Sequence, residues 1–331
     1  MKNRVVISVV LLLFIRLAAF ELTEERVAYC DSILTLILNS NFEKALSHTD
    51  AAIKKDSNDI LAAVLHLSAL GLRDLDYDEM VDSTAFLKSF ERACSLISRY
   101  QRVHGTCSLS ETLKGMALSM HASFYLRNRA YLAAYSTGMD AIRTLQEARE
   151  LDPSNKDVNF FLGLYDYARA ELRRRFWWVL FWYPGDKSSG IEQLEQCAQE
   201  AHLTRYSALL ALSDIYLQED KPEKSLAIIE RLSLKFPDSR FVLWAKAKYY
   251  DDQGMYAKAA QVYGILSKSY KSEAMGSHNS MMTANKQAHM LYNAGKPEEA
   301  ARVCRDILER AEIQNNRSLR RDTERLLRRA N

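Results

Sequence analysis

The residues that could do chemistry are scattered along this sequence and form no recognisable motif. The seven histidines stand singly, and no two of the five cysteines form a Cys-x-x-Cys pair. The sequence contains no His-Glu-x-x-His zinc motif, no Gly-x-Ser-x-Gly nucleophile turn and no glycine-rich phosphate loop. We therefore expect no enzymatic activity, no metal, no cofactor and no small-molecule substrate.

Two further groups of reactive residues have simpler interpretations. The acidic run from Asp74 to Glu79 alternates like a calcium loop, but it lacks the glycine and the final acid that such a loop needs. Helix capping and contact with solvent explain it better. Four of the five cysteines lie in helical patterns, which predicts buried free thiols; a Cys94–Cys107 disulfide is the alternative.

Composition points to long helices. Gly and Pro together make up about 5% of the 331 residues, against about 12% in an average protein. So few turn-forming residues exclude sandwiches, propellers and α/β enzymes with many loops. The net charge of +3 gives no reason to expect a nucleic-acid partner.

The first twenty residues have the pattern of an export signal. Lys2 and Arg4 precede an unbroken apolar run, Val5 to Ile15, and small residues follow at positions 18 and 19. As a helix this run would span about 16 Å, half of a ~30 Å bilayer core. We expect residues 1–20 to be a cleaved signal peptide or an uncleaved anchor, and the protein to lie in the periplasm or on the extracytoplasmic face of a membrane.

The remainder contains helical repeats. Windows starting at Tyr206, Arg240 and Met281 each read as helix, short corner, helix. Gly254 and Gly295 can end a helix with positive φ, and prolines begin two of the second helices. Small residues permit close helix contact at Ser225, Ala259 and Ala300, and large apolar residues follow at helical spacing: Ile229, Tyr263, Cys304, Leu232, Leu266 and Ile307.

These windows resemble tetratricopeptide repeats. The residues that match the family pattern are Leu212, Ser213, Tyr216, Ser225 and Pro237, then Ala247, Tyr250, Gly254, Tyr256, Ala259 and Tyr263, then Ala288, Leu291, Gly295 and Ala300. The resemblance implies an all-α fold, a right-handed α-α superhelix of antiparallel helix pairs. We divide the chain into residues 1–20, a degenerate repeat region 21–156, a degenerate repeat 157–205 with an insertion at 173–190, three clear repeats 206–316 and a basic capping helix 317–331.

The segment 157–200 departs from the repeat pattern. A helix containing Gly163 and Leu164 is followed by an apolar insertion, by Gly185 and Asp186, by Gly190 and by a further helix. This arrangement is similar to poorly characterised bacterial exported tetratricopeptide proteins. It also resembles the eukaryotic repeat family associated with the outer mitochondrial membrane and inclusion clearance.

The insertion carries an aromatic block, residues 176–183, that includes Trp177, Trp178 and Trp182 and follows Arg173, Arg174 and Arg175. As a helix the block would reach only about 12 Å, too short to span a bilayer. A wedge folded between helices is one interpretation. A membrane-interface foot, with the arginines against anionic lipid, is the second, and a protein contact is the third.

The last helical pattern, 317–329, has six arginines against two acids. A solvated cap of the repeat array explains it, and a surface for phosphate or anionic lipid is the alternative.

Function follows from the resemblance. In the tetratricopeptide family the second, fifth, ninth and twelfth positions of each first helix face a concave groove that binds a protein or peptide. Trp244 would be the anchor here, with Lys248 and Asn285 as polar clamps. The complete set of groove residues is Asp214, Leu217, Trp244, Lys248, Asp251, Asn285, His289 and Tyr292. We expect a scaffold for cell-envelope assembly or maintenance; the alternative is a peripheral membrane protein.

Overall fold

The computed structural model describes residues 22–175, 185–273 and 276–331. The predicted signal segment and the aromatic block 176–183 therefore lie outside the described residues. Across the described ranges the chain consists of α-helices and two 3-10 turns, with no strand. The α-helices are α2 (Glu24–Leu38), α3 (Phe42–Lys55), α4 (Ile60–Tyr77), α5 (Ser83–His104), α6 (Ser108–Arg127), α7 (Tyr131–Leu151), α8 (Asn159–Arg175), α10 (Lys187–Glu200), α11 (Arg205–Gln218), α12 (Pro222–Lys235), α13 (Arg240–Asp252), α14 (Tyr256–Lys271), α15 (Ser277–Asn293), α16 (Pro297–Leu308) and α17 (Arg317–Ala330). The 3-10 turns are η1 (Lys156–Val158) and η2 (Ala311–Asn315).

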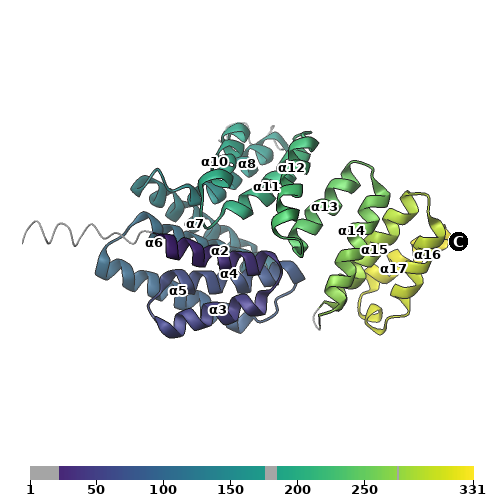
Figure 1. Ribbon diagram of the computed structural model, residues 1–331, viewed down its shortest axis with the longest axis horizontal. Coiled ribbons are helices and arrows are strands. Elements are labelled where there is room, and N and C mark those ends of the chain that lie inside the picture. Colours follow the sequence, from purple (N-terminus) through teal and green to yellow (C-terminus); the bar gives the residue numbers. More distant parts are fainter. Residues whose placement is uncertain (1–21, 176–184, 274–275) are drawn as a thin grey trace, which may run out of the picture. The chain divides into compact units, whose positions relative to one another are not determined.

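The helices form two compact units. The first gathers residues up to Ile37, 41–72 and 82–208, and the second gathers 38–40, 73–81 and 209–331. In each unit consecutive helices pack as antiparallel pairs, for example α6 with α7 and α8 with α10 in the first, and α13 to α16 in the second (Figure 1). This confirms the predicted all-α fold of stacked helix pairs.

Within the described ranges, six helix corners share one backbone cap. Each has a residue with φ between 50° and 75° just after the helix, and the next amide donates to the carbonyl five residues back at 2.8–3.2 Å. This is the Schellman arrangement, which satisfies carbonyls left unpaired at a helix end. Gly254 and Gly295 were the two predicted positions. The other four corners use residues with side chains: Ser40, Asp78, Arg129 and Asp220.

The predicted helix contacts are present in the second unit. Pro222 and Pro297 are the first residues of α12 and α16. The small residues Ser225, Ala259 and Ala300 are completely buried, and the Ser225 hydroxyl donates to the carbonyl of Ser213 at 2.7 Å. The large apolar positions that follow them are also buried, namely Ile229, Tyr263, Cys304, Leu232, Leu266 and Ile307.

The glycines of the departing segment 157–200 have steric roles. A Cβ on Gly163 would stand 2.8 Å from the carbonyl oxygen of Gly190, and a Cβ on Gly190 would meet the carbonyl of Gly163 at the same distance. Helices α8 and α10 therefore cross with their backbones almost in contact. A Cβ on Gly185 would lie 2.6 Å from the amide nitrogen of Ala170, and Asp186 caps α10 by accepting from Ser188 N at 2.9 Å.

The five cysteines are free thiols. Cys30, Cys197 and Cys304 are buried, as predicted, whereas Cys94 and Cys107 are partly exposed and unbridged. Burial is the main reason why the pKa of the Cys30 and Cys197 thiols rises to about 12. Such thiols behave as small core hydrophobes.

None of the helices in the described ranges is both long enough and apolar enough to cross a membrane.

Candidate partner-binding face

The predicted groove residues lie on α11, α13 and α15, the first helices of the three clear repeats. Asp157, a buried residue of η1, fixes the start of α11. Its carboxylate accepts hydrogen bonds from Leu203 N at 2.7 Å and from Thr204 N at 2.9 Å. These amides precede the helix, so the carboxylate sits where the helix dipole favours negative charge.

An ion pair brings the predicted positions of two successive repeats together. Lys248 Nζ on α13 contacts the carboxylate of Asp214 on α11, and the two side chains are 55% and 43% exposed. One helical turn further along each helix, Leu217 and Asp251 are partly exposed. We call these four residues the α11–α13 row.

Trp244 is held by the helix that follows it. Its indole Nε1 donates to the hydroxyl of Tyr270 at 3.1 Å, and its ring packs edge-on against Tyr263 with centroids 5.8 Å apart. Burial, and secondarily the charge of Asp251, raises the pKa of Tyr263 to about 12, so this phenol stays neutral. Trp244 thus offers a partner part of its ring, while its N–H is already bonded.

On α15 the predicted groove residues contact the chain's own last helix. Asn285 Nδ2 donates to Asp322 Oδ2 on α17 at 2.7 Å, and His289 Nε2 lies 2.8 Å from the same oxygen. The guanidinium of Arg329 lies 5.1 Å from the centre of the Tyr292 ring. Asn285 is only 6% exposed, so the predicted polar clamp at this position is occupied within the chain.

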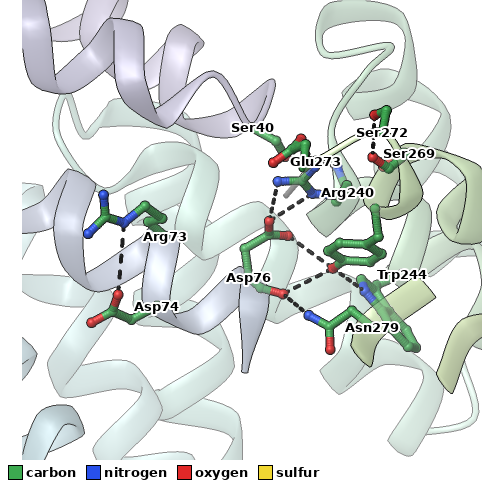
Figure 2. Close-up of polar contacts among 11 residues, drawn as sticks. Ser40, Arg73, Asp74, Asp76, Arg240, Trp244, Ser269, Ser272, Glu273 and Asn279 are labelled. Carbon is green, nitrogen blue, oxygen red and sulfur yellow. Dashed lines mark hydrogen bonds and ion pairs between the residues drawn. The ribbon is translucent and has the colours of Figure 1, made fainter. Parts of the chain in front are cut away.

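Trp244 is linked through the Tyr270 hydroxyl to a buried polar cluster that the sequence did not predict. It lies in the second unit, where Asp76 at the end of α4 meets Arg240 at the start of α13 (Figure 2). Arg240 Nε donates to Asp76 Oδ2 at 2.7 Å, and the side chains are 2% and 1% exposed. The Tyr270 hydroxyl, which accepts from Trp244, donates to the Asp76 carbonyl at 3.0 Å.

The same cluster includes two residues near the start of α15. Asn279 Nδ2 donates to the Asp76 carbonyl at 3.3 Å, and Arg240 Nη1 contacts Glu273 Oε1 at 2.5 Å. Burial, and then repulsion from Asp76, raises the pKa of Glu273 to about 7. The guanidinium also faces the Tyr270 ring at 4.7 Å. The cluster thereby ties the residues around Asp76 to α13, α14 and the start of α15.

This corrects the interpretation of the acidic run 74–79. Asp76 is buried and ion-paired, not solvated, because α13 supplies an arginine for it. A sequence signal existed, since Asp76 follows the buried Ala69 by seven residues and so shares its helix face. Within the described ranges no group of three or more His, Cys, Asp or Glu side chains could hold a metal ion.

The arginines before the aromatic block lie at the end of α8 and are partly or fully exposed. Arg174 Nη2 pairs with Glu171 at 2.7 Å, and Lys187 Nζ, at the start of α10, pairs with the same carboxylate at 2.6 Å. Glu171 therefore connects α8 with the helix that follows the aromatic block. The predicted contacts of Trp177, Trp178 and Trp182 lie outside the described residues.

No protein-family model matches this sequence, and no curated protein matches it. Among solved structures the chain is similar to the APC/C hetero-tetramer Cut9–Hcn1, with 13% identity and a TM-score of 0.49 over 93% of this chain and 56% of that one. It is also similar to yeast Tom70 (9% identity, TM-score 0.37, covering 92% and 90%) and to the P58(IPK) TPR domain (15%, 0.21, covering 92% and 97%).

The chain thus spans little more than half the length of the Cut9–Hcn1 chain it matches. At such identities and scores the likeness identifies no function. The tetratricopeptide-like fold rests on the helix pairs, the shared corner caps and the buried small residues of this chain itself. The resemblances to exported bacterial proteins and to the eukaryotic inclusion-clearance family remain predictions.

Proposed function

We propose that the protein is a non-enzymatic scaffold that binds a protein or peptide partner along the α11–α13 row. The Asp214–Lys248 ion pair carries the proposal, because it sets predicted groove positions of two successive repeats side by side on one surface. Leu217 and Asp251 extend that surface by one helical turn. Helical repeat arrays bind partners along such rows, which neighbouring repeats build jointly.

Helix α15 offers fewer accessible side chains to a partner than the sequence predicts. Asn285 and His289 are bonded to Asp322, and Tyr292 lies under Arg329. Asn285 is buried, and α17 leaves His289 and Tyr292 only partly exposed. We therefore propose that the contacts centre on α11 and α13, with the exposed part of Trp244 at their edge.

Photo-crosslinking from single positions tests this proposal. A photoreactive amino acid at Leu217 is expected to give adducts of discrete mass in the source cell. The same amino acid at Leu234, which lies on α12 and is 87% exposed, is the matched control and is expected to give none. Lys248→Glu, combined with the probe at Leu217, is expected to weaken the adducts. Equal adducts from both positions, or none from Leu217, would contradict a binding role of the row.

We also propose that the protein is exported and acts in the cell envelope. The apolar run from Val5 to Ile15 behind Lys2 and Arg4 supports this. Mass spectrometry of the protein from its own cell is expected to find a mature N-terminus close to residue 20. Recovery of intact Met1 in the soluble cytoplasmic fraction would oppose export.

Peripheral membrane contact is a second candidate, and exposed apolar side chains in the first unit favour it. At the corner between α6 and α7, Leu126, Tyr131, Leu132 and Tyr135 are 57%, 63%, 89% and 70% exposed. Arg129 stands at the same corner. Aromatic, leucine and arginine side chains together are typical of segments that enter a lipid headgroup layer.

The end of α8 lies toward the same corner. Helix α8 runs antiparallel to α7, since Val158 and Leu162 pack with Leu145 and Ala148, and Tyr165 Oη lies 3.7 Å from Met139 Sδ. Continuing this register brings the arginines 173–175 toward the first turn of α7. They would add positive charge against anionic phosphates.

Flotation with vesicles that contain anionic lipid tests this candidate. One variant, Leu132→Ser with Tyr135→Ser, removes two exposed side chains of the corner between α6 and α7. A second variant, with Trp177, Trp178 and Trp182 changed to Ser, removes the tryptophans of the aromatic block. Wild type is expected to float and both variants to stay at the bottom, with circular dichroism as the folding control. If wild type does not float, membrane contact is wrong.

A further inference from the structure

The face of α17 beside α15 carries a row of exposed arginines. Arg317, Arg321 and Arg325 are exposed, follow one another at four-residue intervals and line a cavity of about 780 Å³. Residues four apart lie on the same helix face, about 6 Å apart along the axis. Within the described ranges none of the three has an ion pair. We call these three residues the arginine row.

Two other arginines of α17 have contacts outside the cavity. Arg320 Nε pairs with Glu324 at 2.9 Å, and Arg329 covers Tyr292. Among the described residues, Asp322 is the one acid that lines the cavity. Burial disfavours its charge, but hydrogen bonds from Asn285 and His289 and the nearby Arg325 outweigh that effect and lower its pKa. Three arginines against one carboxylate leave the cavity with an excess of positive charge.

The arginine row is held on a docked helix. Thr323 and Leu326 of α17 are buried, and Leu326 packs with Ala288 and Cys304. The backbone under the guanidinium groups is therefore fixed before any ligand arrives. A fixed row loses less entropy on binding than a mobile arginine-rich tail would.

The spacing of the arginine row and the residues that line the cavity indicate the chemistry of the ligand. In an extended peptide every second side chain points the same way, about 6.7 Å apart, which is close to the ~6 Å step of the arginine row. Guanidinium groups bind carboxylates through paired hydrogen bonds. Met282 and Leu319 add only two apolar side chains to the cavity lining, which is too little for the continuous ridges that a packed partner helix requires.

We propose that the arginine row binds an extended acidic segment of a protein partner, with Asp or Glu at alternate positions. The inference rests on the proposed scaffold function but uses a different surface from the α11–α13 row. Loss of crosslinks at Leu217 would therefore leave it intact, and its own failure would leave the α11–α13 row intact.

The test is fluorescence anisotropy with purified protein and a labelled nine-residue peptide that alternates Glu with Ala. Binding is expected with a Kd below about 1 mM. Arg321→Gln is expected to weaken it about tenfold, the effect of losing one charge-assisted contact of roughly 1.4 kcal/mol. Arg328→Gln removes the same charge from an exposed position of α17 outside the cavity and is expected to change Kd less than about twofold. Thermal unfolding checks that both variants fold.

Three results would overturn the proposal. Equal weakening by both variants would mean that any charge on α17 attracts the peptide without a defined site. Tighter binding of a peptide with Glu at every fourth position would indicate a helical ligand instead. Absence of peptide binding, together with binding of anionic vesicles that Arg321→Gln abolishes, would assign the arginine row to lipid.

Discussion

Arg240 donates from Nε to the carboxylate of Asp76 at 2.7 Å, joining two buried side chains that are 164 positions apart in the sequence. Around this pair gather the hydroxyl of Tyr270, the amide of Asn279 and the carboxylate of Glu273. A buried pair of this kind contributes little net stability when intact, but it is costly to break, because one charge is then left without its partner. The pair specifies which segments of the chain lie together in the second unit.

The first prediction follows from this asymmetry. Asp76→Ala is expected to lower the free energy of unfolding of the second unit by about 3–5 kcal/mol, because Arg240 stays buried without its main partner. The double variant Asp76→Leu with Arg240→Met is expected to lose clearly less than the sum of the single changes. Urea unfolding of all variants measures both effects. Asp238→Ala, at an exposed acid near Arg240, is the control, and additive losses would contradict the prediction.

The shared corner cap gives the second prediction. Arg129 and Asp220 adopt positive φ, which costs a residue with a Cβ about 1 kcal/mol. Arg129→Gly and Asp220→Gly are each expected to raise stability by roughly 0.5–1 kcal/mol. Gly254→Ala is expected to lower stability by a similar amount. A Cβ there would meet no atom within 4 Å, so the loss would come from the backbone conformation alone. Thermal unfolding measures these changes; a loss of stability in either glycine variant would contradict the assignment.

The repeats could be predicted from the sequence because each corner, small residue and apolar face is specified within about 35 residues. Gly254, Pro297 and Ala300 carry their roles in their own type and spacing. The corner at Arg129 could not be predicted, because a residue other than glycine takes the positive φ there.

The polar cluster around Asp76, and the contacts of α17 with the predicted groove residues of α15, could not be predicted in the same way. Asp76 and Arg240 are far apart in sequence, and nothing in either local window says that the other charge is near. Likewise Asn285 and His289 match the groove pattern, but only the packing of α17 reveals that both side chains are hydrogen-bonded to Asp322. Local patterns fix helices and their faces, whereas the partner of a face depends on long-range packing.

The glycine crossing of α8 and α10 gives the third prediction. Gly163→Ala would place a Cβ 2.8 Å from the carbonyl oxygen of Gly190, so the helices must separate, at a cost of about 1–3 kcal/mol. Gly138→Ala on α7 is the matched control, because its nearest neighbour is 3.9 Å away. There, replacing glycine within a helix is expected to raise stability by about 0.5–1 kcal/mol. Chemical denaturation measures the free energy of unfolding of both variants. Equal changes would mean that the backbones of α8 and α10 are not in close contact.

The fourth prediction concerns pH. Hydrogen bonds from Arg174 and Lys187 lower the pKa of Glu171 to about 2, below its ordinary value of 4.5. A carboxylate with a lowered pKa stabilises the fold above pH 4.5 and loses that contribution as the pH falls toward 2. Glu171→Gln is therefore expected to cost about 0.5–1 kcal/mol at pH 7, a modest value because the pair is near the surface, and nothing near pH 2. Glu150→Gln, at an exposed glutamate of α7, is the control for paired unfolding curves. A difference that persists at pH 2 would contradict the role of the ion pair.

The last prediction tests how α17 is held against α15. Asp322→Ala removes the acceptor shared by Asn285 and His289 and leaves the buried amide of Asn285 with a lost hydrogen bond, at a cost of about 1–2 kcal/mol. Hydrogen exchange is expected to accelerate across residues 317–330 and to stay unchanged in α13. Asp306→Ala, at an exposed position of α16, is expected to leave both regions as they are. Because release of α17 would expose more of His289 and Tyr292, crosslinks from a probe at Tyr292 should be stronger in the Asp322 variant than in the unaltered protein. Equally strong crosslinks in both proteins would mean that α17 does not restrict access to this part of the face.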